Sequence, residues 1–422
     1  MKSNIKYILI GGIIGNFIEW YNFLLYGFLA PIISLLFFPL QNKTIALLFT
    51  YSIFAVSFLA RPLGGLFIGY LGDTYGRQRA LIISLIMMLI PALLIGLLPT
   101  YQSIGLASPI LLCLLRILQG FSTGGEHTGS AIYVYEHAPT TYKSFWITTI
   151  PAIVALGIFM SSATAWIILH LFKRTVLLAW GWRIGFWLGA LFCIVGILLR
   201  LKLPETPAFQ QMKKQLKKPI PLSLIFSEKY LLKNMLILLL LSSCWGIIYQ
   251  ILYVWMPTYL SHYQFLTNSK SLAINNSYLL LFSLCILLAG YLADKTNRLP
   301  LLFIACSLLI ISAYPLFTWL SSHNLTKINC AMLILSVIFS VYIAASFTIM
   351  VTLFQVEIRY TTFSLGFNLG LAIFGGSCPL IVTWLIHLTN NNKAPAYYII
   401  SAATMGFLAC LLLINKQSLQ KK

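Results

Sequence analysis

The sequence predicts an all-α membrane protein of twelve transmembrane helices, arranged as two parallel six-helix halves. Three observations support this prediction: the composition, the spacing of apolar stretches and an internal repeat. Of the 422 residues, 59% are hydrophobic and only 9% are charged, and the mean hydropathy is +0.89. A soluble globular protein could not present such a composition to water, so the chain must cross a membrane many times.

Apolar stretches long enough to cross a bilayer, about 20 residues each, define the predicted helices. In the first half they cover residues 8–31, 45–71, 80–99, 107–134, 145–170 and 183–199. In the second half they cover residues 234–258, 277–293, 300–320, 330–354, 362–388 and 397–414. Lys2 and Lys6 precede the first stretch as in a signal peptide, but no small-x-small cleavage site follows. We therefore expect the first span to be retained.

A repeated motif predicts the relation between the halves. Residues 69–77 read GYLGDTYGR and residues 290–298 read GYLADKTNR. Each copy follows an even-numbered predicted helix into a short loop, so the two halves have the same orientation. We predict halves at residues 1–200 and 234–422, joined by a basic cytoplasmic linker loop at residues 201–233. Parallel repeats of this kind are typical of transporters that bind substrate near the membrane midplane.

Basic residues are distributed unequally between the two sides of the membrane. The side of the N-terminus carries 19 of the 28 Lys and Arg residues, the opposite loops carry seven, and Arg61 and Arg116 lie within helices. The positive-inside rule places both termini in the cytoplasm. This topology accounts for the net charge of +20 without a nucleic-acid partner. The eight cysteines and six histidines form no metal-ligand spacing, so we expect no metal and no cofactor.

Several motifs then resemble a known group of proteins. The signature loop of the major facilitator superfamily is similar to GYLGDTYGRQR at 69–79. The fourth-helix arginine motif of that superfamily is similar to RILQG at 116–120. Bacterial metabolite:proton symporters, especially proline/betaine symporters, resemble GNFIEWYNFLLYGF at 15–28 and LQGFSTGGEHTGSAIYVYEHAP at 118–139. The resemblance covers nearly the whole chain. It implies the major facilitator fold, a bacterial inner membrane, and a monomeric transport unit that carries a small molecule with protons through a lipid bilayer.

Four charged residues lie deep in predicted helices: Glu19, Arg61, Arg116 and Glu126. Each is costly in hydrocarbon and needs a partner or a polar cavity. Glu19 and Arg61 both lie roughly 16 Å from their cytoplasmic helix ends, so they form a candidate pair that Glu126 could join. We expect Glu19 and Glu126 to carry protons. The alternative is a permanent structural salt bridge.

Arg116 and Arg61 are expected to contact substrate, although either arginine could instead hold helices together. Helical spacing places Asn22 and Tyr26 on the same stripe of the first helix as Glu19, so both join the expected substrate site. Asn22 stands where the resembled symporters usually have an aspartate, which leaves proton transfer to the glutamates.

Aromatic and histidine residues supply further candidates. Tyr133 is an expected substrate contact, and with Tyr135, Tyr253 and Trp255 it could enclose a quaternary ammonium group through cation–π attraction. Packing is the commoner role of such aromatic side chains. His127 is a candidate proton relay, but a lone intramembrane histidine is more often a hydrogen-bonded packing residue.

The repeated motif predicts a conformational latch. Ion pairs and helix-end contacts of this kind can form in one transport state and break in the other. The expected latch residues are Gly69, Asp73, Gly76, Arg77, Asp294 and Arg298. Asn297 replaces the glycine in the second copy, so we expect the second latch to be less complete.

The predicted function is proton-coupled uptake of a small zwitterion. Two buried acids and two buried arginines sum to zero, which suits a zwitterion or a small anion that travels with protons. The resemblance points to proline or glycine betaine, and a dicarboxylate or another small organic acid is the alternative. The last residues, NKQSLQKK, lack the long coiled-coil extension of osmosensing relatives, so we do not expect regulation of that kind.

Other function classes have less support. A drug exporter is disfavoured because residues 146–166 lack the GxxxGPxxGG pattern of antiporters. An enzyme acting on lipid-linked substrates would need loop carboxylates that already belong to transporter-like motifs. A nutrient sensor that binds but does not transport remains the third alternative.

Overall fold

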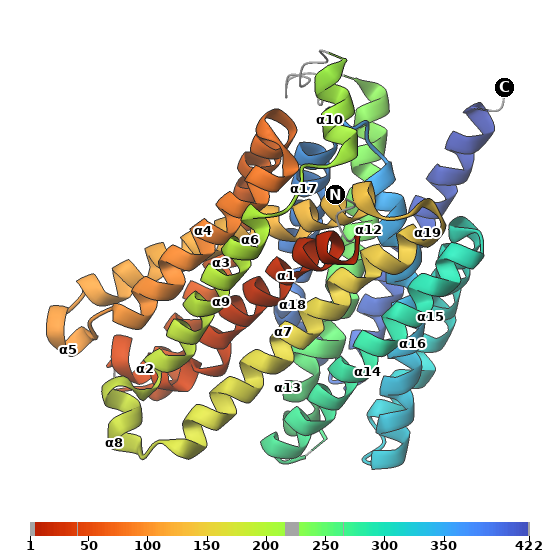
Figure 1. Cartoon of the computed structure of the whole chain (residues 1–422). Coiled ribbons are helices and arrows are strands. Elements are labelled where there is room, and N and C mark those ends of the chain that lie inside the picture. Colours follow the sequence, from red (N-terminus) through yellow and green to blue (C-terminus); the bar gives the residue numbers. More distant parts are fainter. Residues whose placement is uncertain (1–4, 40, 216–227, 265, 421–422) are drawn as a thin grey trace. The chain divides into compact units, whose positions relative to one another are not determined.

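The computed structural model describes residues 5–39, 41–215, 228–264 and 266–420. These residues form helices joined by short connections, and no strand occurs among them (Figure 1). Twelve helices in the described ranges are long and apolar enough to cross a membrane, which confirms the predicted number. The largest boundary error is at the sixth span, which runs from Arg174 to Leu201 rather than over residues 183–199. A π-helical segment, Leu177–Gly181, continues the helix there, although Lys173, Arg174 and Arg183 lie within a few residues of it.

The chain divides into two compact units. Unit 1 comprises Met1–His137, Ile153–Pro219 and Val356–Leu365, and unit 2 comprises Ala138–Ala152, Ile220–Gln355 and Gly366–Lys422. Each unit therefore includes a short segment from the other sequence half. Two helices continue from one unit into the other: α7 (Lys143–Leu171) and α17 (Arg359–Gly370). The sequence boundaries at 1–200, 201–233 and 234–422 stay a prediction.

Unit 1 is a helical bundle around α6. Its helices are α1 (Ile5–Phe28), α2 (Ala30–Phe37), α3 (Lys43–Tyr75), α4 (Arg77–Leu97), α5 (Tyr101–Ile104), α6 (Ala107–His137), α8 (Arg174–Val176), η2 (Leu177–Gly181), α9 (Arg183–Leu201) and α10 (Pro207–Lys214). The α6 helix packs against α1, α3 and α4, while α9 packs against α1 and α4. This arrangement brings polar residues of α6 inside the bundle.

Glycines allow α3 and α6 to approach closely. A Cβ added at Gly120 would collide with the carbonyl of Ser57, and one at Gly124 would collide with the carbonyl of Arg61. On the facing helix, a Cβ at Gly64 would collide with the carbonyl of Phe121. Gly120 and Gly124 are four residues apart, the small-xxx-small spacing of membrane helix pairs. The close contact places Arg61 of α3 at the level of the polar stretch of α6.

Unit 2 contains the remaining helices. They are η1 (Thr140–Tyr142), α12 (Lys229–Tyr249), η3 (Gln250–Trp255), α13 (Met256–His262), α14 (Asn268–Lys295), α15 (Arg298–Leu320), α16 (Leu325–Thr352), η4 (Leu371–Gly375), α18 (Cys378–Thr389) and α19 (Pro395–Gln420). The α15 helix packs against α16 and α19, and α14 packs against α16 through Ala289, Ala293 and Ala344. The packing of α14 and α15 positions the second copy of the repeated motif.

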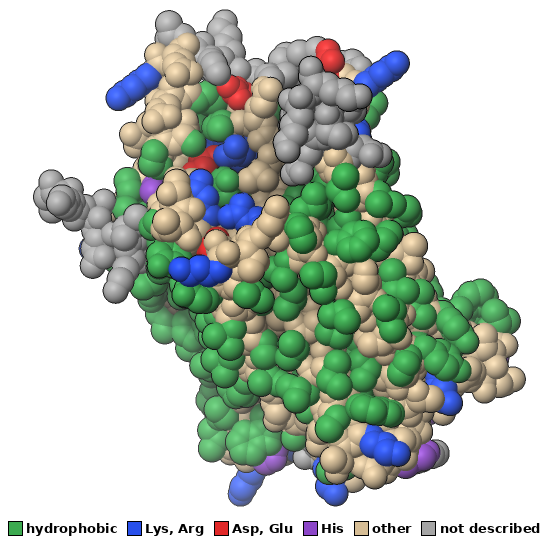
Figure 2. Space-filling model, turned by 90° about the vertical axis from the view of Figure 1, so that its right-hand side faces the viewer, with side chains coloured by type: hydrophobic (Ala, Val, Ile, Leu, Met, Phe, Trp, Pro, Cys, Tyr) green, Lys and Arg blue, Asp and Glu red, His purple; other side chains and the backbone are tan. Residues whose placement is uncertain are grey.

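Exposed apolar side chains cover much of the surface. Figure 2 shows one face on which hydrophobic side chains fill the broad middle, whereas Lys and Arg side chains gather toward the ends. Large residues such as Leu284, Leu288 and Ile311 are more exposed than buried. A surface of this kind fits hydrocarbon, where charged groups are costly.

The α3–α6 contact can be tested by replacing Gly120, which lies in the contact, with alanine, and by making the same change at a glycine outside it. We expect Gly120→Ala to destabilise the protein by about 1–3 kcal/mol, because the added methyl group must displace backbone. Gly27→Ala is the matched control, since its Cβ would lie 3.8 Å from Phe54, an ordinary contact. Thermal unfolding in detergent should show a lower apparent melting temperature for Gly120→Ala only. Equal melting temperatures would contradict the close contact.

Candidate functional site

The α6 helix carries the central polar residues of unit 1. Small and hydroxyl side chains dominate it between Gln119 and Ser130, and these positions are buried. Small side chains let neighbouring backbones approach, so the few large polar groups on α6 must find partners on α1, α3, α4 and α9. The structure shows that these partners differ strongly from one charged residue to the next.

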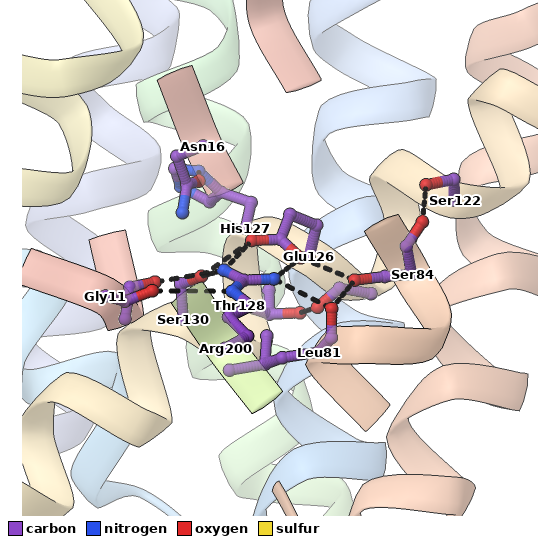
Figure 3. Close-up of polar contacts among 12 residues, drawn as sticks. Gly11, Asn16, Leu81, Ser84, Ser122, Glu126, His127, Thr128, Ser130 and Arg200 are labelled. Atoms are coloured by element: carbon purple, nitrogen blue, oxygen red, sulfur yellow. Dashed lines mark hydrogen bonds and ion pairs between the residues drawn. The ribbon is translucent and has the colours of Figure 1, made fainter. Parts of the chain in front are cut away.

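Glu126 forms a bidentate ion pair with Arg200 of α9 (Figure 3). Arg200 donates from Nη2 to Oε1 at 2.5 Å and from Nη1 to Oε2 at 2.7 Å. Ser84 donates to Oε2 at 2.5 Å and Ser130 donates to Oε1 at 2.9 Å. Both charged side chains are at most 1% exposed. Glu126 is therefore a fully hydrogen-bonded anion, and parallel charge-assisted bonds of this kind are strong.

Arg200 also fastens neighbouring helices to this pair. It donates to the carbonyl of Leu81 in α4 at 2.8 Å and to that of Gly12 in α1 at 3.1 Å. The predicted sixth span ended at residue 199 and left Arg200 outside the membrane helices, and the structure corrects this boundary. The reason is that α9 continues to Leu201 and buries its last turn. The sequence held one indication of this pair. Glu126 lies too far along α6 from Arg116 to pair with it, so a buried Glu126 needed another cation.

Glu19 has a contrasting environment. Its side chain is 1% exposed, and neither carboxylate oxygen accepts a hydrogen bond within the described part of the chain. The neighbouring Thr123 hydroxyl donates instead to the carbonyl of Gln119 at 2.8 Å. The predicted direct pair with Arg61 is not formed, although Arg61 remains close enough to act on Glu19 electrostatically. The Arg61 guanidinium lies 5.4 Å from the centre of the Trp20 ring.

Aromatic rings surround Arg116, and it forms no ion pair with a carboxylate in the part of the chain that the structure describes. Its guanidinium is 4.6 Å from the ring centre of Phe23 and 4.5 Å from that of Tyr26. Nη1 donates to the Phe23 carbonyl at 3.2 Å and to Gln119 Oε1 at 2.6 Å. Its Nε and Nη2, and Nε2 of Gln119, have no hydrogen-bond partner among the described residues. These unpaired donors form a buried cluster suited to an oxyanion.

Not all of the other predicted substrate contacts lie around Arg116. Tyr26 does, with its hydroxyl donating to the carbonyl of Thr50 at 3.0 Å. Asn22 instead donates to the carbonyl of Gly189 at 3.3 Å in the interface with α9. Tyr133 donates to the carbonyl of Pro204, within the linker, at 2.7 Å.

The remaining aromatic and histidine candidates are also engaged. In unit 2, Tyr253 donates to Ser336 at 2.9 Å and Trp255 donates to Thr383 at 3.1 Å. In unit 1, His127 Nδ1 lies 2.9 Å from Oδ1 of Asn16 (Figure 3). These contacts favour packing roles for the three side chains.

The first copy of the repeated motif caps a helix in unit 1. Asp73 accepts hydrogen bonds from the backbone N–H of Tyr360 at 3.2 Å and of Thr361 at 2.8 Å, at the start of α17. A carboxylate at a helix N-terminus satisfies free N–H groups and the helix dipole. A Cβ on Gly69 would lie 2.7 Å from the backbone of Thr361, which explains the glycine.

Charged residues extend this contact into a network. Arg77 lies 3.2 Å from Asp73 and donates to the carbonyl of Val356 at 2.6 Å. Glu136 lies 3.7 Å from Arg77 and 3.0 Å from Arg359. The sequence prediction missed Glu136 and Arg359. A second repeat marked this region, since residues 136–141 read EHAPTT and residues 357–362 read EIRYTT.

The linker that follows α9 docks on this network. Glu205 accepts a hydrogen bond from the N–H of Gln78 at 3.3 Å, and the ring of Phe209 in α10 lies 5.1 Å from the Arg77 guanidinium. Burial raises the pKa of the Glu205 carboxyl, and the hydrogen bonds that it accepts oppose this shift. Gly76 has φ of 115° and no side chain, so the Glu205 carboxylate can occupy the space beside it. Residues 203–214 are called the strap below.

The second copy of the motif caps α7 in unit 2. Asp294 accepts hydrogen bonds from the N–H groups of Ser144 and Phe145, both at 2.7 Å. Arg298 donates to the Ser144 hydroxyl at 2.9 Å but lies 3.5 Å from Asp294 and is 32% exposed. Asn297 adopts an ordinary φ of −77° and caps α15 with its own side chain. Asp294 thus accepts both cap hydrogen bonds, whereas Arg298 is less enclosed than Arg77, and a less complete second latch stays a prediction.

Comparison with known proteins adds an independent line of evidence. The sequence model of the Sugar (and other) transporter family matches residues 8–220. The glycine betaine/proline/ectoine/pipecolic acid transporter of Dickeya dadantii is 33% identical over 415 residues, covering 95% of this chain and 81% of that protein. The proline/betaine transporter of Escherichia coli K12 is 32% identical over 403 residues, covering 94% of this chain and 80% of that protein.

Solved structures show the same fold. The proton:xylose symporter XylE aligns with a TM-score of 0.78 at 16% identity, covering 98% of this chain and 96% of that chain. The human organic anion transporter MFSD10 aligns with a TM-score of 0.68 at 15% identity, covering 98% and 100% of the two chains. These identities are low, so the structures bear on the fold alone. The fold that the sequence motifs implied is confirmed.

The Glu126–Arg200 pair can be tested by a double-mutant cycle. We expect Arg200→Met alone to cost about 3–5 kcal/mol of stability, because it leaves a buried carboxylate without its counter-ion. Adding Glu126→Gln to that variant should recover part of this loss. Apparent melting temperature and the folded fraction in gel filtration measure both effects. Additive losses from the two substitutions would mean that the residues do not form a pair.

The two helix caps can be tested separately by hydrogen exchange. We expect Asp73→Ala to speed amide exchange at Tyr360 and Thr361, because their N–H groups lose the carboxylate acceptor. Asp294→Ala should instead speed exchange at Ser144 and Phe145. Each variant is the control for the other. Faster exchange at both sites in each variant would indicate general destabilisation rather than loss of one cap.

Proposed function

This chain belongs to the Sugar (and other) transporter family of the major facilitator superfamily, and on that premise we propose that it takes up a small zwitterionic metabolite together with protons. It is a multi-pass membrane transporter rather than an enzyme. Proline and glycine betaine are the proposed substrates, since relatives that cover most of the chain are named as their transporters. Alternating access through a site near the midplane is the proposed mechanism.

The proposed setting is a bacterial inner membrane with both termini in the cytoplasm. Relatives from Dickeya dadantii and Escherichia coli support a bacterial membrane. The orientation rests on the distribution of Lys and Arg, of which 19 of 28 fall on the side of the N-terminus. We also propose that one chain is a complete transport unit.

The observation that carries the proton-coupling proposal is the contrast between Glu19 and Glu126. Both are buried carboxylates, but Glu126 has four donated hydrogen bonds and Glu19 has none from the described residues. An ionised carboxylate without donors is expensive in a membrane interior, and binding a proton removes that cost. Glu19 is therefore the better proton carrier. A role of Glu126 in proton transfer stays a prediction, and its contacts favour a fixed ion pair.

Arg116 is the proposed partner of the substrate carboxylate. Its unpaired Nε and Nη2, with Nε2 of Gln119, can donate to two carboxylate oxygens. Arg61 stays a second candidate. The buried charged residues around α6 now include Arg200, so they are the arginines Arg61, Arg116 and Arg200 and the glutamates Glu19 and Glu126. Positive charge among these five exceeds negative charge by one. This excess also favours the second candidate function, proton-coupled uptake of a small organic acid.

The helix caps supply a proposed conformational switch. Asp73 and Asp294 each hold the first turn of a helix, α17 or α7, that continues from one unit into the other. A few such hydrogen bonds can form in one access state and break in the other. Gly69, Gly76, Arg77 and Arg298 are the proposed supporting residues of this latch.

Uptake by purified protein in proteoliposomes tests the function directly. We expect labelled proline or glycine betaine to accumulate when an inward proton gradient is imposed, and a protonophore should abolish the accumulation. Binding without flux, seen as a substrate-dependent rise in melting temperature, would support the sensor alternative. Neither binding nor flux in folded protein would refute the zwitterion proposal, and a dicarboxylate in the same assay would test the second candidate.

Glu19→Gln tests the coupling residue. We expect this variant to lose gradient-driven accumulation while it still exchanges internal for external substrate, because a neutral amide mimics the protonated acid permanently. Glu228→Gln, the same change at an exposed carboxylate, should leave accumulation unchanged. Gradient-driven accumulation by the Glu19 variant would exclude Glu19 as the proton carrier.

A further inference from the structure

Three aromatic rings surround the guanidinium of Arg61 in unit 1. Its central carbon lies 5.4 Å from the ring centre of Trp20, 6.0 Å from that of Phe23 and 5.5 Å from that of Phe58. Trp20 and Phe23 belong to α1 and Phe58 belongs to α3, so both helices contribute. Rings within about 6 Å attract a cation through their π faces. The rings of Trp20, Phe23 and Phe58 are called the aromatic box below.

The rings of the aromatic box also contact one another. The Phe23 and Phe58 rings are 5.0 Å apart and meet edge to face at 83°, and the Phe23 and Trp20 rings are 6.2 Å apart. Phe23 is fully buried and Trp20 is 9% exposed. Packed rings restrict where the guanidinium can move, so the box fixes the position of Arg61 in addition to attracting its charge.

Glu19 lies beside this box without an ion pair to Arg61. It directly precedes Trp20 in α1, and neither of its carboxylate oxygens accepts a hydrogen bond among the described residues. Arg61 nevertheless acts on it electrostatically. The other buried carboxylate of this region, Glu126, is instead contacted by Arg200 at 2.5 Å. One buried arginine thus closes on a carboxylate, whereas the other lies among rings.

The helices packed against α1 contribute the other charged and titratable groups near Glu19. Glu126 of α6 and Arg200 of α9 also act on it, but their charges oppose each other within one ion pair. His127 of α6 lies within electrostatic reach of Arg61. The α2 helix has no charged residue, and those of α4 lie in its first turn. Arg61 is thus the charge whose effect on Glu19 depends most on where its side chain is held.

We propose that the aromatic box holds Arg61 out of direct contact with Glu19 and so leaves this carboxylate able to bind a proton. Trp20, Phe23 and Phe58 are positioning residues in this arrangement, since they act through Arg61. A guanidinium in direct contact strongly favours the ionised carboxylate, so a closed pair would oppose proton binding. The inference rests on the proposed function, in which Glu19 is the proton carrier.

Infrared difference spectroscopy of the full-length protein in lipid vesicles tests this inference without any substrate. The C=O stretching band of protonated carboxyl groups is recorded over a series of pH values. The part of this band that Glu19→Gln removes belongs to Glu19. Its midpoint against pH measures the proton affinity of that carboxylate directly.

Methionine substitutions remove a ring but keep most of the filled volume. In Trp20→Met and in Phe58→Met we expect Arg61 to reach Glu19, because the rings no longer hold it. The midpoint should then fall by about 1 pH unit or more, a loss of proton affinity of about tenfold or more. Trp20→Phe and Phe58→Tyr keep an aromatic ring and should retain the original midpoint.

Phe67→Met is the matched control for loss of a ring. Its ring packs 5.6 Å from that of Phe121 between α3 and α6, so the change removes an aromatic contact elsewhere in the same helix pair and should leave the midpoint unchanged. Phe23 is kept intact because its ring also lies 4.6 Å from Arg116, the proposed substrate contact.

A second background separates the position of Arg61 from water that enters the box. In Arg61→Gln protein, Trp20→Met and Phe58→Met should no longer change the midpoint, since their effect requires the guanidinium. An equal shift in that background would mean that hydration of Glu19 causes it, and would overturn the inference. Should Arg61→Gln fail to fold, Trp20→Phe decides instead, because it also vacates space but retains a ring, and a shift as large as that of Trp20→Met would overturn the inference.

The remaining outcomes distinguish this inference from the proposed function. The same midpoint in the unsubstituted protein and in both methionine variants would refute the inference and leave the proposed role of Glu19 intact. No Glu19 band in any of these proteins would refute both. The expected shift in a protein that shows no gradient-driven accumulation would support the positioning of Arg61 and refute proton-coupled uptake.

Discussion

The ion pair between Glu126 and Arg200 is the interaction on which the rest of unit 1 depends. Arg200 pairs with α6 and also donates to backbone carbonyls of α1 and α4, so one guanidinium joins four helices. Burying two charges in a membrane is tolerable only when nearly every donor and acceptor is satisfied. The small residues around the pair follow from this constraint, since a Cβ on Gly15 would occupy the space of the Arg200 guanidinium.

Against this satisfied pair, the incompletely bonded groups have functional meaning. Glu19 lies in the same buried layer without a hydrogen-bond donor among the described residues, and Arg116 has two nitrogen atoms without an acceptor there. Buried polar groups are almost always hydrogen-bonded in proteins, so such exceptions require an explanation. In the mechanism that we propose, a proton on Glu19 and a substrate carboxylate beside Arg116 would supply the missing partners. In that proposal, the fixed pair maintains the fold while Glu19 and Arg116 change their partners.

The internal repeat shows how similar sequences reach different contacts. Asp73 and Asp294 both cap the start of a helix, as their equal positions in the motif require. Around them the copies differ, because Gly76 leaves room for the carboxylate of the strap whereas Asn297 caps its own helix. The arginine is consequently covered in one unit and partly exposed in the other.

The twelve spans, the parallel repeat and the family can be recognised from the amino-acid sequence alone, because they depend on apolar stretches of fixed length and on motifs that are contiguous in the chain. The sequence also identified Glu19, Arg61, Arg116 and Glu126 as buried, since charges within apolar runs are visible without a structure. Only the tertiary structure decided their partners. Arg200 is 74 residues from Glu126 and follows an apolar run at the edge of a basic linker, so its sequence context favours solvent. Pairing is decided by which helices pack together and how their ends extend, and those are properties of long-range contacts that no local pattern encodes.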